Sequence, residues 1–536
     1  MITTLKNANE KTLGEIKEEM EIRKTKELFL LFSLGSQFDH LIKQALDKLG
    51  VFCLVADSNK IKFEDVYKIM PKGIILSGGP VSVYSDPLPF DEKIFSLGIP
   101  VLGICLGFQL WAQSIGCLVR KGEKKEFSTH ELQVLEPSPL FYSCEKVMSV
   151  LESHGDIVVP LSGNTHFEIL ALTENSPIAA ARFKHLYGVQ FHPEVTETTY
   201  GLQMFENFCF EICGANDRYP AMDVAKQKIN NLMEEIGEKK VLLAISGGSD
   251  SSTVAYLLKE ALRSQPGKIK GVYIKGIDRP DDEAYVLEYF DNKEWIELKI
   301  VDATFEYLNA LQGKSTMPGK RVAMRGIYKA ILENEAREFG ASFIAQGTLY
   351  TDISESGGGY NTGAKKAQIK LHHNVNLGFS LKELTPLDDC VKDSGRNIGR
   401  SIGVPEDLLV RHPFPGPGLV VRIEGEITAD KLRIARKADE ILIKKLRQHN
   451  LYNSVWQAGA VVTNSITTYS KGDDAGNGVV IAIWAVWSVN GFTAQVAELP
   501  WEFVKLISRE ITNEIPEAGA VVYRVSDKPP ATIEWG

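Results

Sequence analysis

A cysteine between two glycines is the first feature of the sequence that could do chemistry. The segment Gly103-Ile104-Cys105-Leu106-Gly107 follows an apolar run and precedes the helical pattern FQLWAQSIG. The glycines allow a sharp turn from strand to helix, and a thiol at a helix N-terminus ionises more easily because of the helix dipole. Cys105 is therefore a candidate nucleophile, although an apolar-flanked cysteine is more often an ordinary buried thiol.

Two other segments carry the groups that such a nucleophile needs. His192 ends the apolar run that begins at Leu186, and Glu194 follows two residues later. The imidazole can act as a base and the carboxylate can orient it. Gly78-Gly79 follows another apolar run, and its backbone N–H groups could bind an oxyanion. The three segments together favour a reactive thiol over a packed one.

A second candidate site is the turn Ser246-Gly247-Gly248-Ser249-Asp250-Ser251-Ser252, which follows the apolar run 241–245 and opens a helical pattern. Glycines let the backbone approach a phosphate, serines add hydroxyl donors, and the helix N-terminus adds positive potential. The turn has no GK[ST] ending and is not a Walker A loop, and Asp250 in place of the lysine indicates contact through Mg²⁺. The alternative is a Ser/Gly turn without a ligand.

The elements that must position these residues are short apolar runs separated by amphipathic segments, a pattern typical of α/β sheets. In the first part of the chain the expected strands lie in 28–32, 51–56, 73–79, 100–107 and 186–194. In the second part they lie in 241–245, 271–274, 295–301 and 341–347. The last part alternates helices expected over 428–449 and 501–514 with strands expected over 479–487 and 520–525, which predicts a small α+β domain.

Composition excludes several classes of protein. With 536 residues, 44% of them hydrophobic, the chain can bury several cores, and its net charge of -9 disfavours nucleic acid as a partner. No run approaches the length of a membrane span, and the charged residues 1–26 lack the apolar region of a signal peptide, so we expect no membrane association. Seven dispersed cysteines argue against a disulfide framework or a zinc site and indicate a cytoplasmic location.

The first half of the chain resembles the class I glutamine amidotransferases over about residues 27–212. The resemblance rests on these motifs: Gly35-Ser36-Gln37, Ser77-Gly78-Gly79-Pro80, the segment 103–107 with Gln109, Ser153-His154-Gly155-Asp156 and His192-Pro193-Glu194. It implies that Cys105 attacks the side-chain amide of glutamine, that His192 carries the proton and that Glu194 orients His192. It also implies that Gly79 and Leu106 bind the oxyanion and that Gln109 helps to bind glutamine.

The second half resembles the PP-loop enzymes, which adenylylate an oxygen and release pyrophosphate. The later motifs narrow the resemblance to glutamine-hydrolysing GMP synthetases: Ala345-Gln346-Gly347-Thr348-Leu349-Tyr350, Asp352, Glu355-Ser356, Ile369-Lys370, His372-His373-Asn374-Val375, the run HPFPGPGL (412–419) after Arg411, and KPPATIEW (528–535). This family joins ammonia from glutamine to XMP, whose C2 oxygen is first adenylylated by ATP.

The resemblance implies roles for further residues. It places the ATP phosphates on residues 246–252, with Mg²⁺ at Asp250, and no prosthetic group. Arg279 and Lys370 would neutralise developing charge, and His372 and His373 would face the nucleotide, although a packed loop pair is the alternative for these histidines. The residues expected to reach XMP are Lys528, Thr532, Ile533 and Glu534. The expected partners are small molecules (glutamine, ATP and XMP) and a second copy of the chain.

The resemblance divides the chain into four segments. Residues 1–26 are an extension, 27–215 a flavodoxin-like class I amidotransferase domain, 216–410 a parallel-sheet PP-loop domain of the adenine nucleotide alpha-hydrolase type, and 411–536 a small α+β domain for dimerisation and substrate binding.

The sequence departs from the family pattern at several positions. Ile274-Lys275 stands where an Asp-Asn pair is usual, Asn464-Ser465-Ile466 where Pro-Val-Arg is expected, and Ala475 where another arginine is usual. Arginine forms bidentate contacts with phosphate that these residues cannot replace. Three hypotheses follow: a GMP synthetase of divergent sequence, a paralogue that uses the same chemistry on another purine-like acceptor, and a non-catalytic relative.

Overall fold

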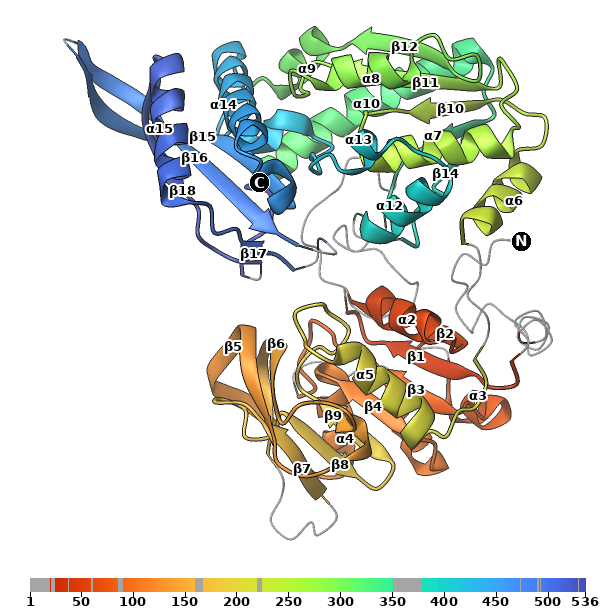
Figure 1. Cartoon of the computed structure of the whole chain (residues 1–536). Coiled ribbons are helices and arrows are strands. Elements are labelled where there is room, and N and C mark those ends of the chain that lie inside the picture. Colours follow the sequence, from red (N-terminus) through yellow and green to blue (C-terminus); the bar gives the residue numbers. More distant parts are fainter. Residues whose placement is uncertain are drawn as a thin grey trace. The chain divides into compact units, whose positions relative to one another are not determined.

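The computed structural model describes residues 20, 25–36, 38–58, 61–84, 90–159, 167–218, 224–349, 352, 377–390, 392–472, 474–488, 491, 493–528 and 530–536. The described chain forms two compact units, one up to Arg218 and one from Val224 onward (Figure 1). The second unit includes both the predicted PP-loop segment and the predicted dimerisation segment.

A nine-stranded sheet forms the centre of the first unit, in the order β2-β1-β3-β4-β9-β8-β7-β5-β6. Five parallel strands lie at one side and four antiparallel strands at the other. The parallel strands are β1 (Phe29–Ser33), β2 (Cys53–Asp57), β3 (Gly73–Leu76), β4 (Val101–Ile104) and β9 (Leu186–Val189). The others are β5 (Leu118–Val134), β6 (Val147–Val159), β7 (Phe167–Leu172) and β8 (Ala180–Phe183). Each of the five apolar runs predicted as strands overlaps one of the parallel strands, and three of them contain it completely, so this part of the fold prediction is confirmed.

Helix α4 (Leu106–Ser114) shows why the parallel strands are apolar throughout. Seven of its nine residues are buried, and Phe108 and Trp111 belong to the same core cluster as alternate residues of β1, β3 and β4. Strands covered by helices on both faces read as continuous apolar runs rather than alternating ones. The other helices of this unit are α2 (Asp39–Lys48), α3 (Phe63–Ile69), α5 (Gly201–Glu206) and a π-helical turn at Asn207–Ile212.

The second unit begins with a five-stranded parallel sheet in the order β12-β11-β10-β13-β14. Its strands are β10 (Val241–Ala244), β11 (Ile269–Lys275), β12 (Glu297–Asp302), β13 (Phe343–Ala345) and β14 (Lys382–Leu384). On one face, Val241 and Leu243 pack with α7 (Ser249–Ala261); on the other, Leu242 and Ala244 pack with α10 (Met317–Phe339). The remaining helices are α6 (Val224–Ile236), α8 (Asp282–Phe290), α9 (Thr304–Leu311), α12 (Lys392–Ser401) and α13 (Glu406–Leu409).

The end of the chain is the α+β domain that the sequence predicts. Strands β15 (Gln457–Lys471) and β16 (Asp474–Trp487) form a long antiparallel pair, to which β17 (Gln495–Val496) and β18 (Ala518–Tyr523) add. Helix α14 (Ala429–Gln448) lies within the predicted range 428–449, and the Thr428 side chain caps it by accepting from Lys431 N. Helix α15 (Trp501–Glu514) has its predicted bounds.

A buried arginine joins the chain terminus to this domain. The Arg422 guanidinium is 1% exposed; it donates to Asp439 Oδ1 at 2.7 Å and to both carboxylate oxygens of Glu534, at 2.8 and 3.1 Å. Gln457 Nε2 donates to the same Glu534 carboxylate at 2.6 Å. Because a buried charge without its partner is strongly destabilising, these contacts hold the last residues in one position.

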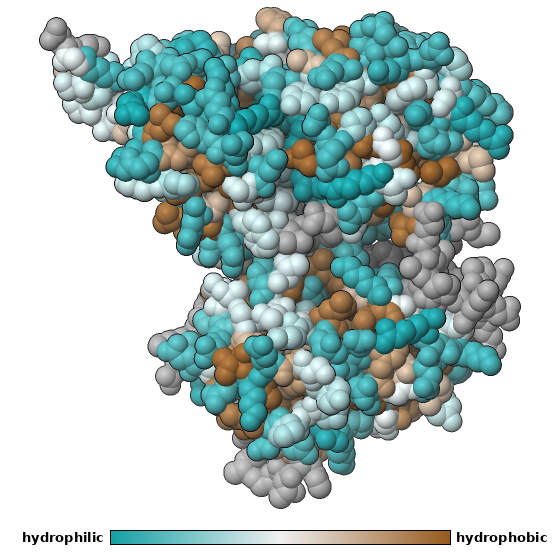
Figure 2. Space-filling view, in the orientation of Figure 1, coloured by the Kyte–Doolittle hydropathy of each residue, from teal (hydrophilic) through white to brown (hydrophobic). Residues whose placement is uncertain are grey.

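The visible face of each unit is mostly hydrophilic, and its hydrophobic residues form small separate groups (Figure 2). Among the described residues, none of the helices has the length and hydrophobicity required to span a bilayer.

Candidate active sites

Cys105 occupies the turn between β4 and α4 with a left-handed backbone, at φ 51° and ψ -105°. A non-glycine residue rarely adopts positive φ, and its occurrence at a strand-to-helix turn is typical of a nucleophile elbow. The turn is held because Cys105 N donates to Val189 O at 2.8 Å and Gln109 N donates to Cys105 O at 3.1 Å. The thiol therefore lies at the helix N-terminus, as the sequence predicts.

His192 and Glu194 form a buried pair beside this thiol. Nδ1 of His192 lies 2.8 Å from Glu194 Oε1, and the side chains are 6% and 0% exposed. Burial disfavours the imidazolium, but the Glu194 charge and the hydrogen bond with Cys105 outweigh it and raise the pKa of His192 well above its usual value. The pair thus favours an imidazolium beside the sulfur, and the structure brings Cys105, His192 and Glu194 together.

Gly78 and Gly79 lie against the same turn. A Cβ on Gly78 would be 3.1 Å from His192 Cε1 and 3.7 Å from Cys105 Cβ. A Cβ on Gly79 would be 2.4 Å from Leu34 O and 2.6 Å from Leu106 Cδ2, closer than real contacts allow. Only glycine fits there, because the backbone of Leu34 and the side chain of Leu106 leave no room for a Cβ.

Gln109 is buried behind the nucleophile. Its Nε2 donates to Gln190 Oε1 and to Asp156 O, both at 3.3 Å, and Gln190 Nε2 lies 3.6 Å from Cys105 Sγ. Gln109 therefore reaches the thiol through Gln190, a residue that the sequence patterns did not single out.

The second site is a pocket at the carboxyl ends of β10, β11 and β13, with a cavity of about 310 Å³. Parallel α/β sheets bind ligands at this edge, and the volume is within the usual range for small-molecule sites. Five residues of the predicted phosphate loop line it: Ser246, Gly248, Ser249, Asp250 and Ser251. Ser252 does not line the pocket. Helix α7 already begins at Ser249, and Ser252 lies on the buried face of this helix.

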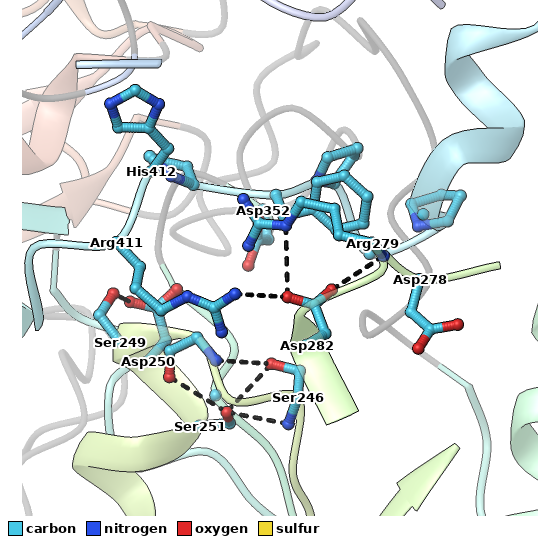
Figure 3. A pocket seen from close by; sticks show the side chains of 18 of the residues that line it. Ser246, Ser249, Asp250, Ser251, Asp278, Arg279, Asp282, Asp352, Arg411 and His412 are labelled. Atoms are coloured by element: carbon cyan, nitrogen blue, oxygen red, sulfur yellow. Dashed lines mark hydrogen bonds and ion pairs between the residues drawn. The ribbon is translucent and has the colours of Figure 1, made fainter. Parts of the chain in front are cut away.

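An arginine from a distant segment, Arg411, holds the loop, and Figure 3 shows its contact with Asp282. Gly247 has φ 68°, which favours glycine, and its carbonyl accepts from Arg411 Nη1 at 3.0 Å. Arg411 Nη2 donates to Asp282 Oδ1 at 2.6 Å, and Asp282 also accepts from Arg279 N and Nε at 3.1 and 3.2 Å. The two arginines and the carboxylate therefore join three segments of chain around the pocket.

Asp250, the predicted magnesium ligand, already has a cationic neighbour. Its Oδ2 accepts from Lys392 Nζ at 2.6 Å and its Oδ1 accepts from the Ser249 hydroxyl at 3.0 Å. Lys392 also lines the pocket. The pocket thus places the ammonium group of Lys392 beside the oxygen atoms of the loop.

The end of the chain supplies part of the same pocket. Lys528, Ile533 and Glu534 line it, together with Trp456 and Gln457. Thr532 is not among the lining residues; its hydroxyl donates to Glu534 O at 2.6 Å and so shapes the terminal turn. The predicted residues Lys370, His372 and His373 lie outside the described part of the chain, as does Gln37.

The comparisons with known proteins find relatives along nearly the whole chain. Family models match for glutamine amidotransferase class-I at residues 30–212, for NAD synthase at 221–323 and for the GMP synthase C terminal domain at 444–535. The glutamine-hydrolysing GMP synthase of Lactococcus lactis subsp. cremoris (strain MG1363) is 37% identical over 522 residues, which cover 95% of this chain and 99% of that protein. That of Aquifex aeolicus (strain VF5) is 40% identical over 515 residues, which cover 94% and 99%.

The chain belongs to the glutamine-hydrolysing GMP synthases. It is an ATP-dependent ligase, and the first of the three hypotheses from the sequence is confirmed. The predicted fold class is confirmed as well, with a class I amidotransferase domain, a parallel-sheet PP-loop domain and a C-terminal domain.

The departures from the GMP synthase pattern lie at the end of β11, beside the pocket, and on the hairpin of β15 and β16. Ile274 lines the pocket as an apolar wall, whereas Lys275 pairs with Glu283 at 3.2 Å outside it. Ile466 on β15 is 61% exposed, and Ala475 on β16 is also exposed. Neither Ile466 nor Ala475 lines the pocket. The absence of arginine at these two positions therefore removes no group from the described cavity.

Sequence reasoning missed the carboxylate and cation partners within the GMP synthase pocket. The contacts of Asp282 with Arg411 and of Lys392 with Asp250 each span more than a hundred residues of chain. In the sequence, the one indication that these two residues belong to a site is that each begins a helix. Asp282 begins α8, after strand β11, and Lys392 begins α12.

His412 gives this site a testable pH dependence. The ring stacks on Tyr452 with centroids 3.8 Å apart, and Nε2 lies 2.7 Å from Tyr452 O. Burial lowers the pKa of His412 to about 3, and the nearby Arg279 charge adds to this effect.

The folded protein keeps His412 neutral, whereas in the unfolded chain this histidine gains a proton below about pH 6.5. The free energy of unfolding therefore falls as the pH is lowered from about 6.5 toward 3. We expect wild type to lose about 2 kcal/mol more stability than His412→Gln between pH 7 and pH 5. Glutamine keeps a donor for Tyr452 O but does not titrate. Urea unfolding at the two pH values measures the difference, and equal losses in both proteins would contradict a neutral His412.

Proposed function

We propose that the chain makes GMP from XMP through two sites, one in each unit. In the first unit the Cys105 thiolate attacks the carboxamide of glutamine, and the backbone N–H groups of Gly79 and Leu106 stabilise the resulting oxyanion. His192 protonates the departing ammonia, and water then hydrolyses the thioester to glutamate with His192 as the base. The contact between His192 and Glu194 at 2.8 Å is the observation that carries this assignment.

In the second unit, the C2 oxygen of XMP attacks the α-phosphorus of ATP and pyrophosphate leaves. Ammonia then adds to C2, and AMP leaves with the former oxygen to give GMP. We assign the ATP phosphates to the loop 246–251, because its hydroxyls and the α7 N-terminus face the pocket and Lys392 and Arg279 line it. Ser252 remains a weaker candidate for the same role.

Magnesium with ATP is part of this proposal. The donors are hard oxygens, since Asp250 and three serine hydroxyls lie together in the loop, and this chemistry fits Mg²⁺. Asp250 would hold the ion against the phosphates, and the bound ion would neutralise charge on the departing pyrophosphate. The ion pair with Lys392 engages one oxygen of Asp250, so the lysine would have to share this carboxylate.

Lys528, Ile533 and Glu534 are our candidates for the XMP side of the pocket, with Thr532 holding the terminal turn. The family membership also supports a homodimer formed through residues 411–536. A reduced thiol nucleophile and nucleotide substrates support a cytoplasmic location.

Replacement of Cys105 tests the first site. Cys105→Ala removes the only sulfur nucleophile of the assigned mechanism, so we expect glutamine-dependent GMP formation to fall at least about 1000-fold. Synthesis from added ammonium should stay within about twofold of wild type. Steady-state rates with each nitrogen source give both numbers. Cys117→Ala, which changes another buried cysteine, is the matched control and should keep both activities; retained glutamine use in Cys105→Ala would refute the assignment.

Asp250→Asn tests the second site. We expect it to suppress pyrophosphate release and GMP formation from either nitrogen source by at least about 100-fold, because the loop loses its charge toward Mg²⁺ and Lys392. Glutamine hydrolysis without nucleotides should remain. Asp291→Asn, at an exposed position outside the pocket, serves as the control. Equal loss of the two half-reactions would contradict the division into two sites.

A further inference from the structure

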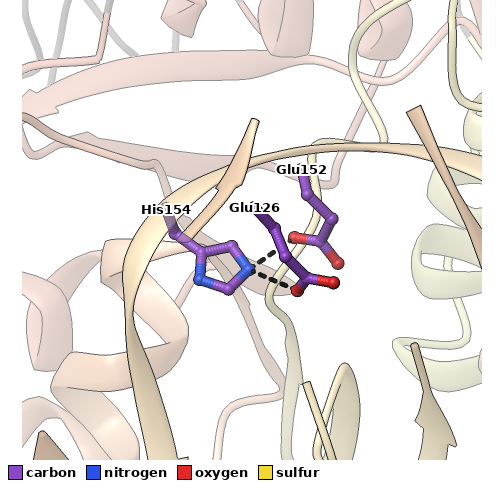
Figure 4. Close-up of side chains that lie close together, drawn as sticks. All are labelled: Glu126, Glu152 and His154. Carbon is purple, nitrogen blue, oxygen red and sulfur yellow. Dashed lines mark ion pairs between the residues drawn. The ribbon is translucent and has the colours of Figure 1, made fainter. Parts of the chain in front are cut away.

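A second buried group of ligating side chains lies in the first unit, apart from the catalytic set. Glu126 comes from β5, and Glu152 and His154 come from β6 (Figure 4). The antiparallel register pairs Glu126 with His154, and residues two apart on a strand point to the same face. The side chains are only 1%, 0% and 3% exposed. The fold therefore brings three potential metal ligands to one point inside the protein.

The three ligand atoms converge. His154 Nε2 lies 2.9 Å from Glu152 Oε2 and 3.3 Å from Glu126 Oε2, and all three atoms lie within 4.8 Å of one another. In Figure 4 the imidazole faces both carboxylates. Ligand atoms around a metal that binds them at 2.0–2.2 Å are separated by roughly 3–4 Å. The group needs only small shifts to surround one ion.

Surrounding residues already orient two of the ligands. His154 Nδ1 lies 3.0 Å from Asp156 O, and a carbonyl can only accept, so this nitrogen carries a hydrogen. Nε2 is then the nitrogen turned toward the carboxylates. The Thr173 hydroxyl donates to Glu126 Oε1 at 2.9 Å. Metal-bound histidines and carboxylates generally have such outer partners, which fix the tautomer and the direction of the lone pairs.

The group brings two buried carboxylates together. Glu152 is fully buried, and neither of its oxygens has a well-aligned hydrogen-bond donor among the described residues. In the same part of the chain, the ion-pair partners of the two glutamates are histidines, His154 for both and His130 at 3.6 Å for Glu126. A protonated His154 would balance one of the two carboxylates and His130 lies farther away at 3.6 Å, whereas one divalent cation in contact with all three ligands balances both carboxylates. A buried charge without compensation is costly.

We propose that Glu126, Glu152 and His154 bind one divalent cation of the zinc class. Two carboxylate oxygens and one imidazole nitrogen suit Zn²⁺, whereas Mg²⁺ and Ca²⁺ take oxygen ligands almost exclusively. The dispersed cysteines argue against a zinc site at the level of the sequence. This site uses no cysteine, and its ligands Glu126 and Glu152 are 26 residues apart in the sequence. Short ligand motifs in the sequence therefore do not indicate this metal site.

The position of the cation connects it to the glutaminase site. His192 N donates to Leu151 O at 3.0 Å, next to Glu152. The Asp156 carbonyl that faces His154 Nδ1 also accepts from Gln109 Nε2. The cation would therefore fix the part of β6 that holds the backbone of His192 and the side chain of Gln109.

Zinc titration of the full-length protein tests the proposal. Cys105→Ala is the parent protein, because the nucleophilic thiol could itself bind Zn²⁺. After removal of metals with a chelator and exchange into chelator-free buffer without nucleotide, calorimetry should find one tight Zn²⁺ per chain. Thermal unfolding should shift upward with Zn²⁺. Adding Glu152→Gln, which is isosteric, should weaken binding at least 100-fold and abolish the shift.

Control variants assign the bound ion. Glu131→Gln changes an exposed glutamate on the same strand β5, and Asp250→Asn removes the loop carboxylate of the other unit; each should leave the tight binding unchanged. Glu126→Gln should weaken Zn²⁺ binding as much as Glu152→Gln does. This variant replaces Glu152→Gln in the test if Glu152→Gln does not fold. A parent protein without stoichiometric Zn²⁺, or equal affinity in the parent and both glutamate variants, would overturn the proposal and leave a proton as the only cation in the group.

Discussion

Both reaction sites depend on one constraint, the sharp turn by which a buried parallel strand enters a helix. In the first unit the turn places Cys105 in left-handed backbone at φ 51°, and in the second it places Gly247 at φ 68°. The strand before each turn is fully buried and cannot shift, so the first residues of the helix are held at the edge of the sheet. The same geometry gives a thiol at one helix N-terminus and a phosphate loop at the other.

The charges around these turns are arranged by side chains from distant segments. Arg411 links the loop carbonyl of Gly247 to Asp282, and Arg422 fixes Glu534 at the end of the chain. Each arginine is almost completely buried with its carboxylate, so the pairs act as rigid joints rather than as surface ion pairs. In this way the parallel sheet and the C-terminal α+β domain contribute to one pocket.

Local patterns in the sequence predicted the parallel strands around both turns, but not the antiparallel strands β5 to β8, the edge strand β14 or the partners of charged groups. The apolar runs of both sheets, the helix after Thr428 and the Cys105 elbow were predicted correctly, because each depends on neighbouring residues. The contacts of Asp250 with Lys392 and of Asp282 with Arg411, like the group of Glu126, Glu152 and His154, join residues far apart in the chain. Ser252 was included in the phosphate loop because of its residue type, but the early start of α7 turns it into the core.

In the proposed reaction, nitrogen released at Cys105 reaches the purine in the second unit. Glutamine labelled with ¹⁵N in the side-chain amide, supplied with unlabelled ammonium, ATP, Mg²⁺ and XMP, tests it most directly by mass spectrometry of the product. We expect ¹⁵N in the 2-amino group of GMP, with one pyrophosphate released per GMP, and no ¹⁵N in the GMP formed by Cys105→Ala. Hydrolysis of glutamine without labelled GMP, while XMP remains unchanged, would contradict it.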